Sequence, residues 1–148
     1  MALAAYCDLR YAVSGAKLTT ATPKLGLPAE YGLSWVLPRL VGVTHAADLL
    51  LTGRALQADD AAAIGLVNEV LPSRKALTKR VREVAEHLAT EVSPASVRAT
   101  KRQLYDDLLR LDVGASVDES TALMSEMMGG RDFSEGVAAL REQRRPRF

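Results

Sequence analysis

The sequence has few of the side chains that build cross-links and metal centres. Its 148 residues include one cysteine, Cys7, and two histidines, His45 and His87. A single cysteine excludes an intrachain disulfide framework and a cysteine-built zinc site. Two histidines leave too few ligands for a histidine metal centre. We therefore expect no bound metal.

Strong net charge and long apolar segments are also lacking. Nineteen basic and 18 acidic residues give a net charge of +1, which argues against a nucleic-acid partner. No apolar run approaches the roughly 20 residues of a membrane-spanning helix. The apolar start, Met1–Tyr6, is too short for a secretory signal and has no basic leader. We expect a cytoplasmic protein without a membrane partner.

The remaining composition is typical of one folded domain. Hydrophobic residues make up 48% of the chain and charged residues 25%, as in ordinary globular proteins. A chain of this length can bury a sizeable core. The hydrophobic pattern predicts short strands within 8–13, 17–22 and 66–71. Two or three short strands do not form a self-sufficient sheet, so their edges need covering by helices or by another chain.

The rest of the pattern is helical. Pro38 predicts a kink in the first long helix, and Gly42 should end it. Ser93 followed by Pro94 is an N-cap with proline at the first helical position. The fold class is thus α/β but mostly helical, with few short strands followed by about five helices. Seven stretches carry the helical pattern when the short ones are included: residues 30–40, 45–51, 58–64, 73–89, 93–111, 116–128 and 132–145.

Several motifs occur in one order along the whole chain. They are Cys7-Asp8-Leu9-Arg10, Lys24-Leu25-Gly26-Leu27-Pro28, Leu37-Pro38-Arg39-Leu40-Val41-Gly42, Leu51-Thr52-Gly53-Arg54, Gly65-Leu66-Val67-Asn68-Glu69-Val70 and Asp132-Phe133-Ser134-Glu135-Gly136. Together these motifs resemble the enoyl-CoA hydratase/isomerase, or crotonase, family.

The resemblance implies the C-terminal part of the crotonase (ClpP/crotonase-like) fold. Residues 1–72 would end the spiral core and carry the active-site loop and the helices after it. Residues 73–148 would form a C-terminal helical oligomerisation region. Family members begin with a spiral of ββα turns that supplies most of the CoA site, and this sequence has no counterpart of it. We therefore expect a natural truncation, a split gene product whose N-terminal half is a separate polypeptide, or a mis-called start.

The resemblance also implies the chemistry. Family members act on acyl-CoA thioesters, here in fatty-acid β-oxidation, and two backbone N–H groups stabilise the enolate oxygen. They need no cofactor beyond the CoA carried by the substrate, and they assemble as trimers or dimers of trimers. Hydratases of the family use two glutamates, and alignment puts Ala2 and Thr22 at those places. Neither side chain can act as a proton-transferring acid or base at neutral pH, so the two-carboxylate mechanism is not supported.

Glu30 is the predicted catalytic residue. The loop from Leu27 to Gly32 stands where hydratases have a P-G-A-G-G loop, and it resembles the isomerases of the family that use one carboxylate as a proton shuttle. A carboxylate against an apolar acyl pocket suits a general base. The alternative interpretation is a carboxylate that stabilises a helix N-terminus through the macrodipole.

The predicted substrate-binding residues are Leu27, Pro28, Trp35 and Lys101. Trp35 would line the acyl pocket, although an ordinary half-buried aromatic explains it as well. Lys101 matches a family lysine that would contact the CoA phosphates. The arginines of residues 141–147 could bind phosphates or form a solvated basic tail.

Two functions stay open at this point. The first is an enoyl-CoA hydratase or isomerase that acts when the site is complete. The second is a catalytically incomplete fragment that serves as an oligomerisation or structural module. The Ala2 and Thr22 replacements favour the second function, whereas the retained loop around Glu30 favours the first.

Overall fold

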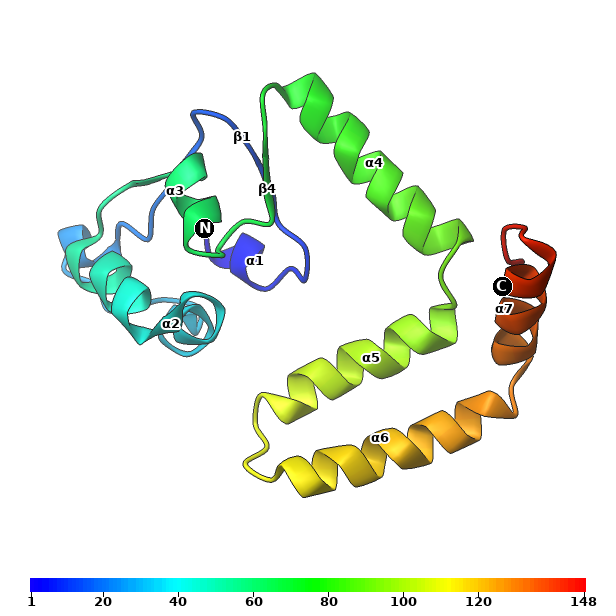
Figure 1. Cartoon of the computed structure of the whole chain (residues 1–148). Coiled ribbons are helices and arrows are strands. Elements are labelled where there is room, and N and C mark those ends of the chain that lie inside the picture. The colour runs from blue at the N-terminus through cyan, green and yellow to red at the C-terminus, as the bar shows by residue number, and fades with distance from the viewer. The chain divides into compact units, whose positions relative to one another are not determined.

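The computed structural model describes residues 1–148 and divides them into two compact units, Met1–Val81 and Arg82–Phe148. Figure 1 labels most of their elements. The boundary at residue 72 that the resemblance implies stays a prediction, as does the oligomerisation role of the second region. No helix of either unit combines the length and apolar character needed to cross a bilayer.

The first unit combines short strands with one long helix. Strand β1 pairs in parallel with β4, and β2 pairs antiparallel with β3, so each sheet has two strands. The strands are therefore shorter than predicted, and β3 was not predicted. The elements are α1 (Ala2–Ala5), β1 (Tyr11–Val13), β2 (Lys17–Leu18), the 3₁₀ helix η1 (Thr22–Leu25), α2 (Leu33–Thr52), β3 (Leu56–Gln57), α3 (Ala58–Ala63), β4 (Glu69–Leu71) and the start of α4 (Arg74–Thr90).

The core of the first unit forms around α2. The largest fully buried side chains are Leu37, Leu49, Leu56 and Leu66. Removal of such a leucine from water contributes about 1.5–3 kcal/mol. The core therefore fixes α2 against α3 and the strand ends, and α2 carries the candidate loop at its N-terminus.

The break in α2 is at Gly42 and not at Pro38. Gly42 has φ 76° and ψ 161°, which is non-helical and lies in a region that glycine adopts readily. The helix resumes after it, so the predicted helices 30–40 and 45–51 join across this break. The predicted kink at Pro38 is wrong. The carbonyl that Pro38 leaves without an amide partner belongs to Ser34, an exposed residue in the first turn.

Arg10 ties the N-terminal segment to the strand region. Its Nε donates to the carbonyl of Leu66 at 2.6 Å and its Nη1 donates to the carbonyl of Cys7 at 2.5 Å. Its backbone N–H donates to the Asn68 side chain at 2.7 Å. Hydrogen bonds to a charged donor are stronger than neutral ones, so Arg10 fixes the chain just before β1.

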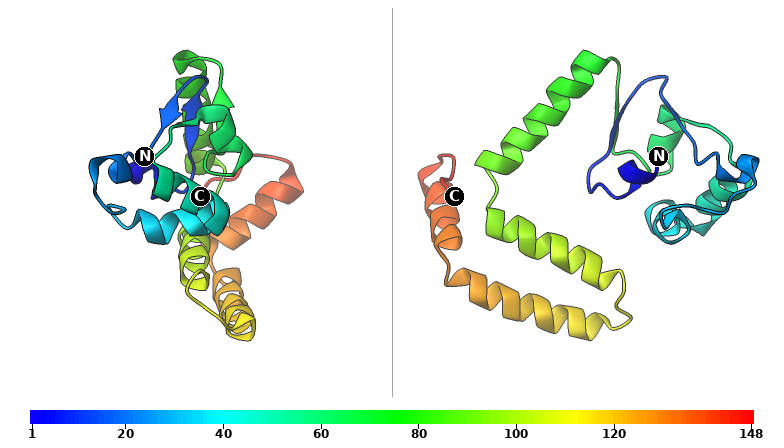
Figure 2. Two further views of the ribbon diagram at one scale, coloured as in Figure 1. Left: turned by 90° about the vertical axis from the view of Figure 1, so that its left-hand side faces the viewer. Right: turned by 180° about the vertical axis from the view of Figure 1, so that it is seen from behind.

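The second unit is helical and contains the end of α4 with α5 (Pro94–Asp107), α6 (Val113–Met128) and α7 (Arg131–Glu142). Figure 2 shows α5 and α6 running back along one another within this unit. Ser93 caps α5 as predicted, because its side chain accepts from the Ser96 amide at 3.1 Å. Helix α5 ends at Asp107, earlier than predicted.

Two helix starts in this unit differ from prediction. Helix α6 begins at Val113, because the Asp112 carboxylate accepts from the amides of Gly114 and Ala115. Helix α7 begins at Arg131 rather than Asp132, and the Asp132 carboxylate accepts from the Ser93 hydroxyl at 2.6 Å. A capping-type side chain can thus serve a tertiary contact instead of its own helix.

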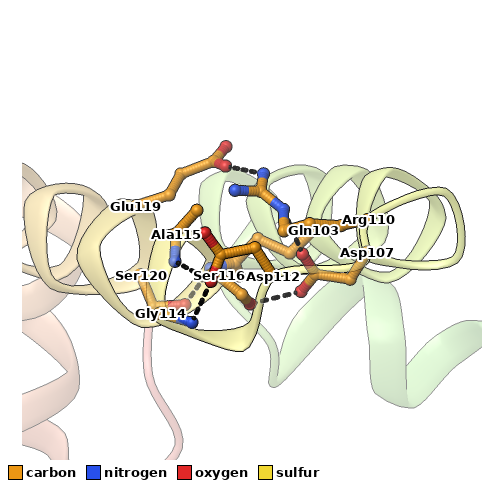
Figure 3. A network of polar contacts seen from close by, with 9 residues as sticks. All are labelled: Gln103, Asp107, Arg110, Asp112, Gly114, Ala115, Ser116, Glu119 and Ser120. Atoms are coloured by element: carbon orange, nitrogen blue, oxygen red, sulfur yellow. Dashed lines mark hydrogen bonds and ion pairs between the residues drawn. The ribbon is translucent and has the colours of Figure 1, made fainter.

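A polar network joins α5 to α6 (Figure 3). The Arg110 guanidinium makes ion pairs with Asp107 and Glu119. The Ser116 hydroxyl donates to Asp107 at 2.7 Å, and Gln103 donates to Ser120 at 3.1 Å. These contacts hold the hairpin at its connection, where no buried apolar side chain lies.

Candidate active-site loop

The loop that carries Glu30 follows η1, and η1 is fixed against the far end of α2. The Thr20 hydroxyl donates to the carbonyl of Leu49 at 3.2 Å, and that of Thr19 donates to the carbonyl of Gly53 at 3.3 Å. Gly53 has φ 57°, and a Cβ there would lie 2.9 Å from Cγ of Pro23. Because Gly53 has no side chain, η1 can approach the end of α2 closely.

The loop ends in a tight turn over residues 30–33. The Leu33 amide donates to the Glu30 carbonyl at 3.0 Å. The two central residues, Tyr31 and Gly32, have φ 51° and 68°. Positive φ at both central positions is the type I′ pattern. Gly32 meets this at little cost, whereas a left-handed conformation costs a residue such as Tyr31 about 1–2 kcal/mol.

The turn leads directly into α2. Gly32 is the N-cap residue, and its carbonyl accepts from the Trp35 and Val36 amides at 2.9 and 3.0 Å. No side chain caps this N-terminus. A carboxylate before an uncapped N-terminus is stabilised by the helix dipole, so the dipole interpretation of Glu30 stands beside the catalytic one.

Tyr6 reaches this turn from α1. Its hydroxyl donates a hydrogen bond to the Tyr31 carbonyl. A Cβ at Gly32 would lie 2.6 Å from the Tyr6 hydroxyl oxygen. The sequence pattern predicts only a core or packing role for Tyr6, because a contact with a backbone carbonyl 25 residues away leaves no local signal. The Tyr6 side chain is in fact about half exposed.

The predicted site residues of the loop share one accessible segment. The Glu30 side chain is exposed and makes no hydrogen bond or ion pair, and Leu27 and Pro28 are exposed beside it. Trp35 is 42% exposed. One face of its indole is covered by the Arg39 guanidinium, 4.0 Å from the ring centroid.

The two positions aligned with the hydratase glutamates hold side chains without a titratable group. Thr22 is buried, with 4% exposure, and its hydroxyl has no hydrogen-bond partner. Ala2 is half-buried in α1. Glu30 is the only acidic side chain of the loop over residues 27–32.

The remaining predicted residues lie in the second unit. Lys101 is exposed on α5, with its ammonium 5.9 Å from the Tyr105 ring centroid. Among the terminal arginines, Arg144 pairs with Glu135 and Glu142, and Arg145 lies 3.4 Å from Glu91. Much of this cationic cluster is thus neutralised within the unit.

Glu135 is the most perturbed acid of the chain. Hydrogen bonds from the Arg144 side chain and then from the Arg147 backbone lower its pKa from 4.5 to about 2, although burial opposes the shift. Hydrogen bonds to Glu135 and then to Glu142 raise the pKa of Arg144 above its ordinary value. This cluster ties the C-terminal segment to α7, which is a structural role for both charges.

Neither unit holds a group of three or more His, Cys, Asp or Glu side chains placed to bind a metal ion.

Known proteins match the whole chain. The family model described as Enoyl-CoA hydratase/isomerase matches residues 1–148. The mitochondrial enoyl-CoA hydratase domain-containing protein 2 of Bos taurus is 34% identical over 149 residues, which covers 99% of this chain and 50% of that protein. The chain spans about half the length of the curated relatives it matches.

Solved structures share the fold. A probable enoyl-CoA hydratase/isomerase of Mycobacterium abscessus superposes with a TM-score of 0.93 at 35% identity, over 99% of this chain and 59% of that one. The enoyl-CoA hydratase of Bacillus anthracis gives 0.90 at 30% identity, over 97% and 55%. The expected partial crotonase fold is confirmed. The chain belongs to the enoyl-CoA hydratase/isomerase family.

Proposed function

We propose that this chain contributes the proton-transfer carboxylate of an enoyl-CoA isomerase or hydratase that acts on acyl-CoA thioesters in fatty-acid breakdown. One observation carries the proposal. Glu30 is exposed and unpaired at the turn before α2, while the two aligned hydratase positions hold Ala2 and Thr22. A single free carboxylate fits proton removal and return better than two-carboxylate hydration.

The proposed step is an isomerisation. Glu30 removes a proton from the carbon between the thioester carbonyl and the double bond of a 3-enoyl chain, and the negative charge moves to the thioester oxygen. The protonated Glu30 then returns the proton to the far carbon of the former double bond. The double bond thereby moves next to the carbonyl, and no atom is gained or lost. Leu27, Pro28 and Trp35 would contact the acyl chain, and Lys101 the CoA phosphates.

The oxyanion donors of this reaction would come from outside the chain. The chain aligns with only about half of its relatives, and we propose that a separate N-terminal half-polypeptide supplies the amides and the apolar walls around Glu30. One removed donor of this kind typically lowers the rate 10²–10³-fold. The substrate would bring its CoA, so no further cofactor is proposed, and the compartment would be the cytoplasm.

We also propose that the second unit assembles the chain into a homo-oligomer, a trimer or a dimer of trimers. It leaves many large apolar side chains exposed, and it contains an open apolar cavity of about 730 Å³. Exposed apolar patches of this kind mark interaction sites. The cavity is lined in part by Met124, Met127, Met128, Phe133 and Phe148.

A second candidate function is a catalytically incomplete module that serves assembly. The observation that favours it is Thr22, which is buried without a partner where hydratases have a glutamate. Binding of acetoacetyl-CoA, an enolate-like ligand, separates the two functions. We would titrate it by calorimetry into the purified chain, with light scattering to give the oligomeric state. Saturable binding supports an acyl-CoA site in this chain. Its absence in a folded oligomer means either the module or half of a site that needs the separate N-terminal half, and repeating the titration with that half distinguishes the two.

Activity tests the role of Glu30 directly. The chain, together with a co-expressed N-terminal half, would be assayed for isomerisation of a 3-enoyl-CoA and for hydration of a 2-enoyl-CoA. Glu30→Gln should lower isomerisation by about 10²–10⁴-fold, the usual contribution of a general base. Asp59→Asn is the control, because Asp59 is an exposed acid of the same unit. An unchanged rate in Glu30→Gln would refute the proposal.

A further inference from the structure

The turn that presents Glu30 has an unfavourable residue at its first central position. Two-residue turns of this type prefer Asn-Gly or Gly-Gly, because both central residues need positive φ. Here the pair is Tyr31-Gly32, with φ 51° and 68°. The Tyr31 ring is 76% exposed, so packing of its own side chain does not hold it in this conformation.

The contact that compensates for the unfavourable conformation of Tyr31 comes from another element. The Tyr6 hydroxyl donates to the Tyr31 carbonyl, which is the peptide group between the two left-handed residues. Tyr6 ends α1, and α1 packs against α2 through the buried Ala5. The donor is therefore held by the core of the unit and not by the turn itself.

The fit around this hydroxyl is close. A Cβ at Gly32 would lie 2.6 Å from the Tyr6 oxygen, nearer than real Cβ atoms come. A side chain at position 32 would therefore require the Tyr6 hydroxyl to move away from the turn. The same turn fixes the backbone position of Glu30, because the Glu30 carbonyl accepts from the Leu33 amide at 3.0 Å. The Glu30 side chain has no contact of its own that would orient it.

We propose that Tyr6 is a positioning residue: its hydroxyl holds the Glu30–Leu33 turn in its left-handed form and so fixes where the Glu30 carboxylate is presented. The structural part of this inference stands on the turn alone. The consequence for catalysis rests on the proposed function of Glu30.

The structural test is amide hydrogen exchange of the Leu33 N–H, followed by NMR in the full chain. Tyr6→Phe removes only the hydroxyl and should raise Leu33 exchange about three- to tenfold, the effect of one lost hydrogen bond. Exchange of the Leu49 amide, in the far half of α2, should stay unchanged. Tyr11→Phe is the matched control, because Tyr11 lies in the same unit and its hydroxyl makes no hydrogen bond.

A rescue variant tests whether the Tyr6 hydroxyl compensates for the unfavourable conformation of Tyr31. Tyr31→Asn gives the Asn-Gly pair that prefers this turn, so it should return Leu33 exchange toward the wild-type rate in the Tyr6→Phe background. Equal exchange in Tyr6→Phe and Tyr11→Phe would overturn the proposal. So would faster exchange at Leu33 and Leu49 together, which would mean a general loss of stability, or a failure of Tyr31→Asn to rescue.

Activity tests the consequence for Glu30. In an active assembly, Tyr6→Phe should lower kcat about tenfold with KM unchanged, and Tyr31→Asn should restore it. Tyr6→Phe combined with Glu30→Gln should be no slower than Glu30→Gln alone. A further fall in the double variant would overturn the positioning role. The exchange experiment does not depend on activity. Failure of the proposed function and failure of Tyr6 to hold the turn therefore give different results.

Discussion

The two units of the chain use their apolar side chains in opposite ways. In Met1–Val81 the apolar side chains form a buried cluster around α2, whereas in Arg82–Phe148 only Ala139 is buried. The second unit instead holds its helices through caps and ion pairs, such as those of Asp112 and Arg110. The difference teaches that the first unit has a core that fixes the loop carrying Glu30, while the second unit leaves the apolar faces of its helices exposed.

Core truncation should show the largest difference between the units. Leu37 has no exposed surface, so Leu37→Ala should lower the free energy of unfolding by about 2–5 kcal/mol through lost burial and a cavity. Leu104 in the second unit is 63% exposed, so Leu104→Ala should cost less than ~1 kcal/mol. Urea unfolding followed by circular dichroism measures both. Similar costs would mean that the second unit has a core of its own in solution.

Loss of a helix cap should have the next largest effect, and it concerns the second unit. Asp112→Ala removes the acceptor for the Gly114 and Ala115 amides and should cost about 0.5–2 kcal/mol. Asp118→Ala, in the exposed part of the same helix, is the control and should change little. The helical signal in circular dichroism during thermal unfolding measures both variants. Equal behaviour would argue against the cap.

A buried hydroxyl in the first unit should give a smaller effect of opposite sign. Thr22→Val removes a hydroxyl that is buried without a partner, so it should raise the free energy of unfolding by about 1 kcal/mol. Thr20→Val should lower it by a similar amount, because the Thr20 hydroxyl donates to Leu49. Differential scanning calorimetry compares the two melting temperatures. A lower melting temperature for Thr22→Val would show that its hydroxyl has a partner in solution.

The smallest expected effect is the pH response of the C-terminal contacts. The pKa of Glu135 is lowered from 4.5 to about 2 by Arg144 and the Arg147 amide. Because the pKa is lowered in the folded state, the contacts of Glu135 contribute fully to the free energy of unfolding above pH 4.5. This contribution is lost as the pH falls toward 2. NMR signals of Phe148, which lies beside Gly136 on α7, should shift in this range. Glu135→Gln should abolish that transition, and its persistence would assign the transition to another group.

Local signals in the sequence predicted much of the fold. The Ser93-Pro94 pair marked the start of α5, and Gly42 marked the break in α2 at positive φ. These features depend on neighbours within a few residues, which a sequence pattern contains. The Pro38 kink was wrong because tolerance of a proline depends on what satisfies the freed carbonyl. The start of α7 was wrong because Asp132 bonds to Ser93, 39 residues away.

The candidate site likewise contains residues that the sequence indicates and one that only the structure reveals. Glu30, Leu27, Pro28 and Trp35 could be named from the sequence, because they lie in one motif that resembles a family loop. Their catalytic and binding roles stay predictions. Tyr6 could not be named, since its acceptor is a backbone carbonyl that any residue could provide.

The sequence by itself determined the order of the helices, the family and the carboxylate that the loop offers. It did so because periodicity, capping residues and motifs are local properties. Only the tertiary structure decided that Tyr31 and Gly32 form a left-handed turn under the Tyr6 hydroxyl, that Thr22 is buried without a partner, and that the apolar core is confined to the first unit. These features depend on which distant segments pack together, and burial and long-range hydrogen bonds exist only once the chain has folded.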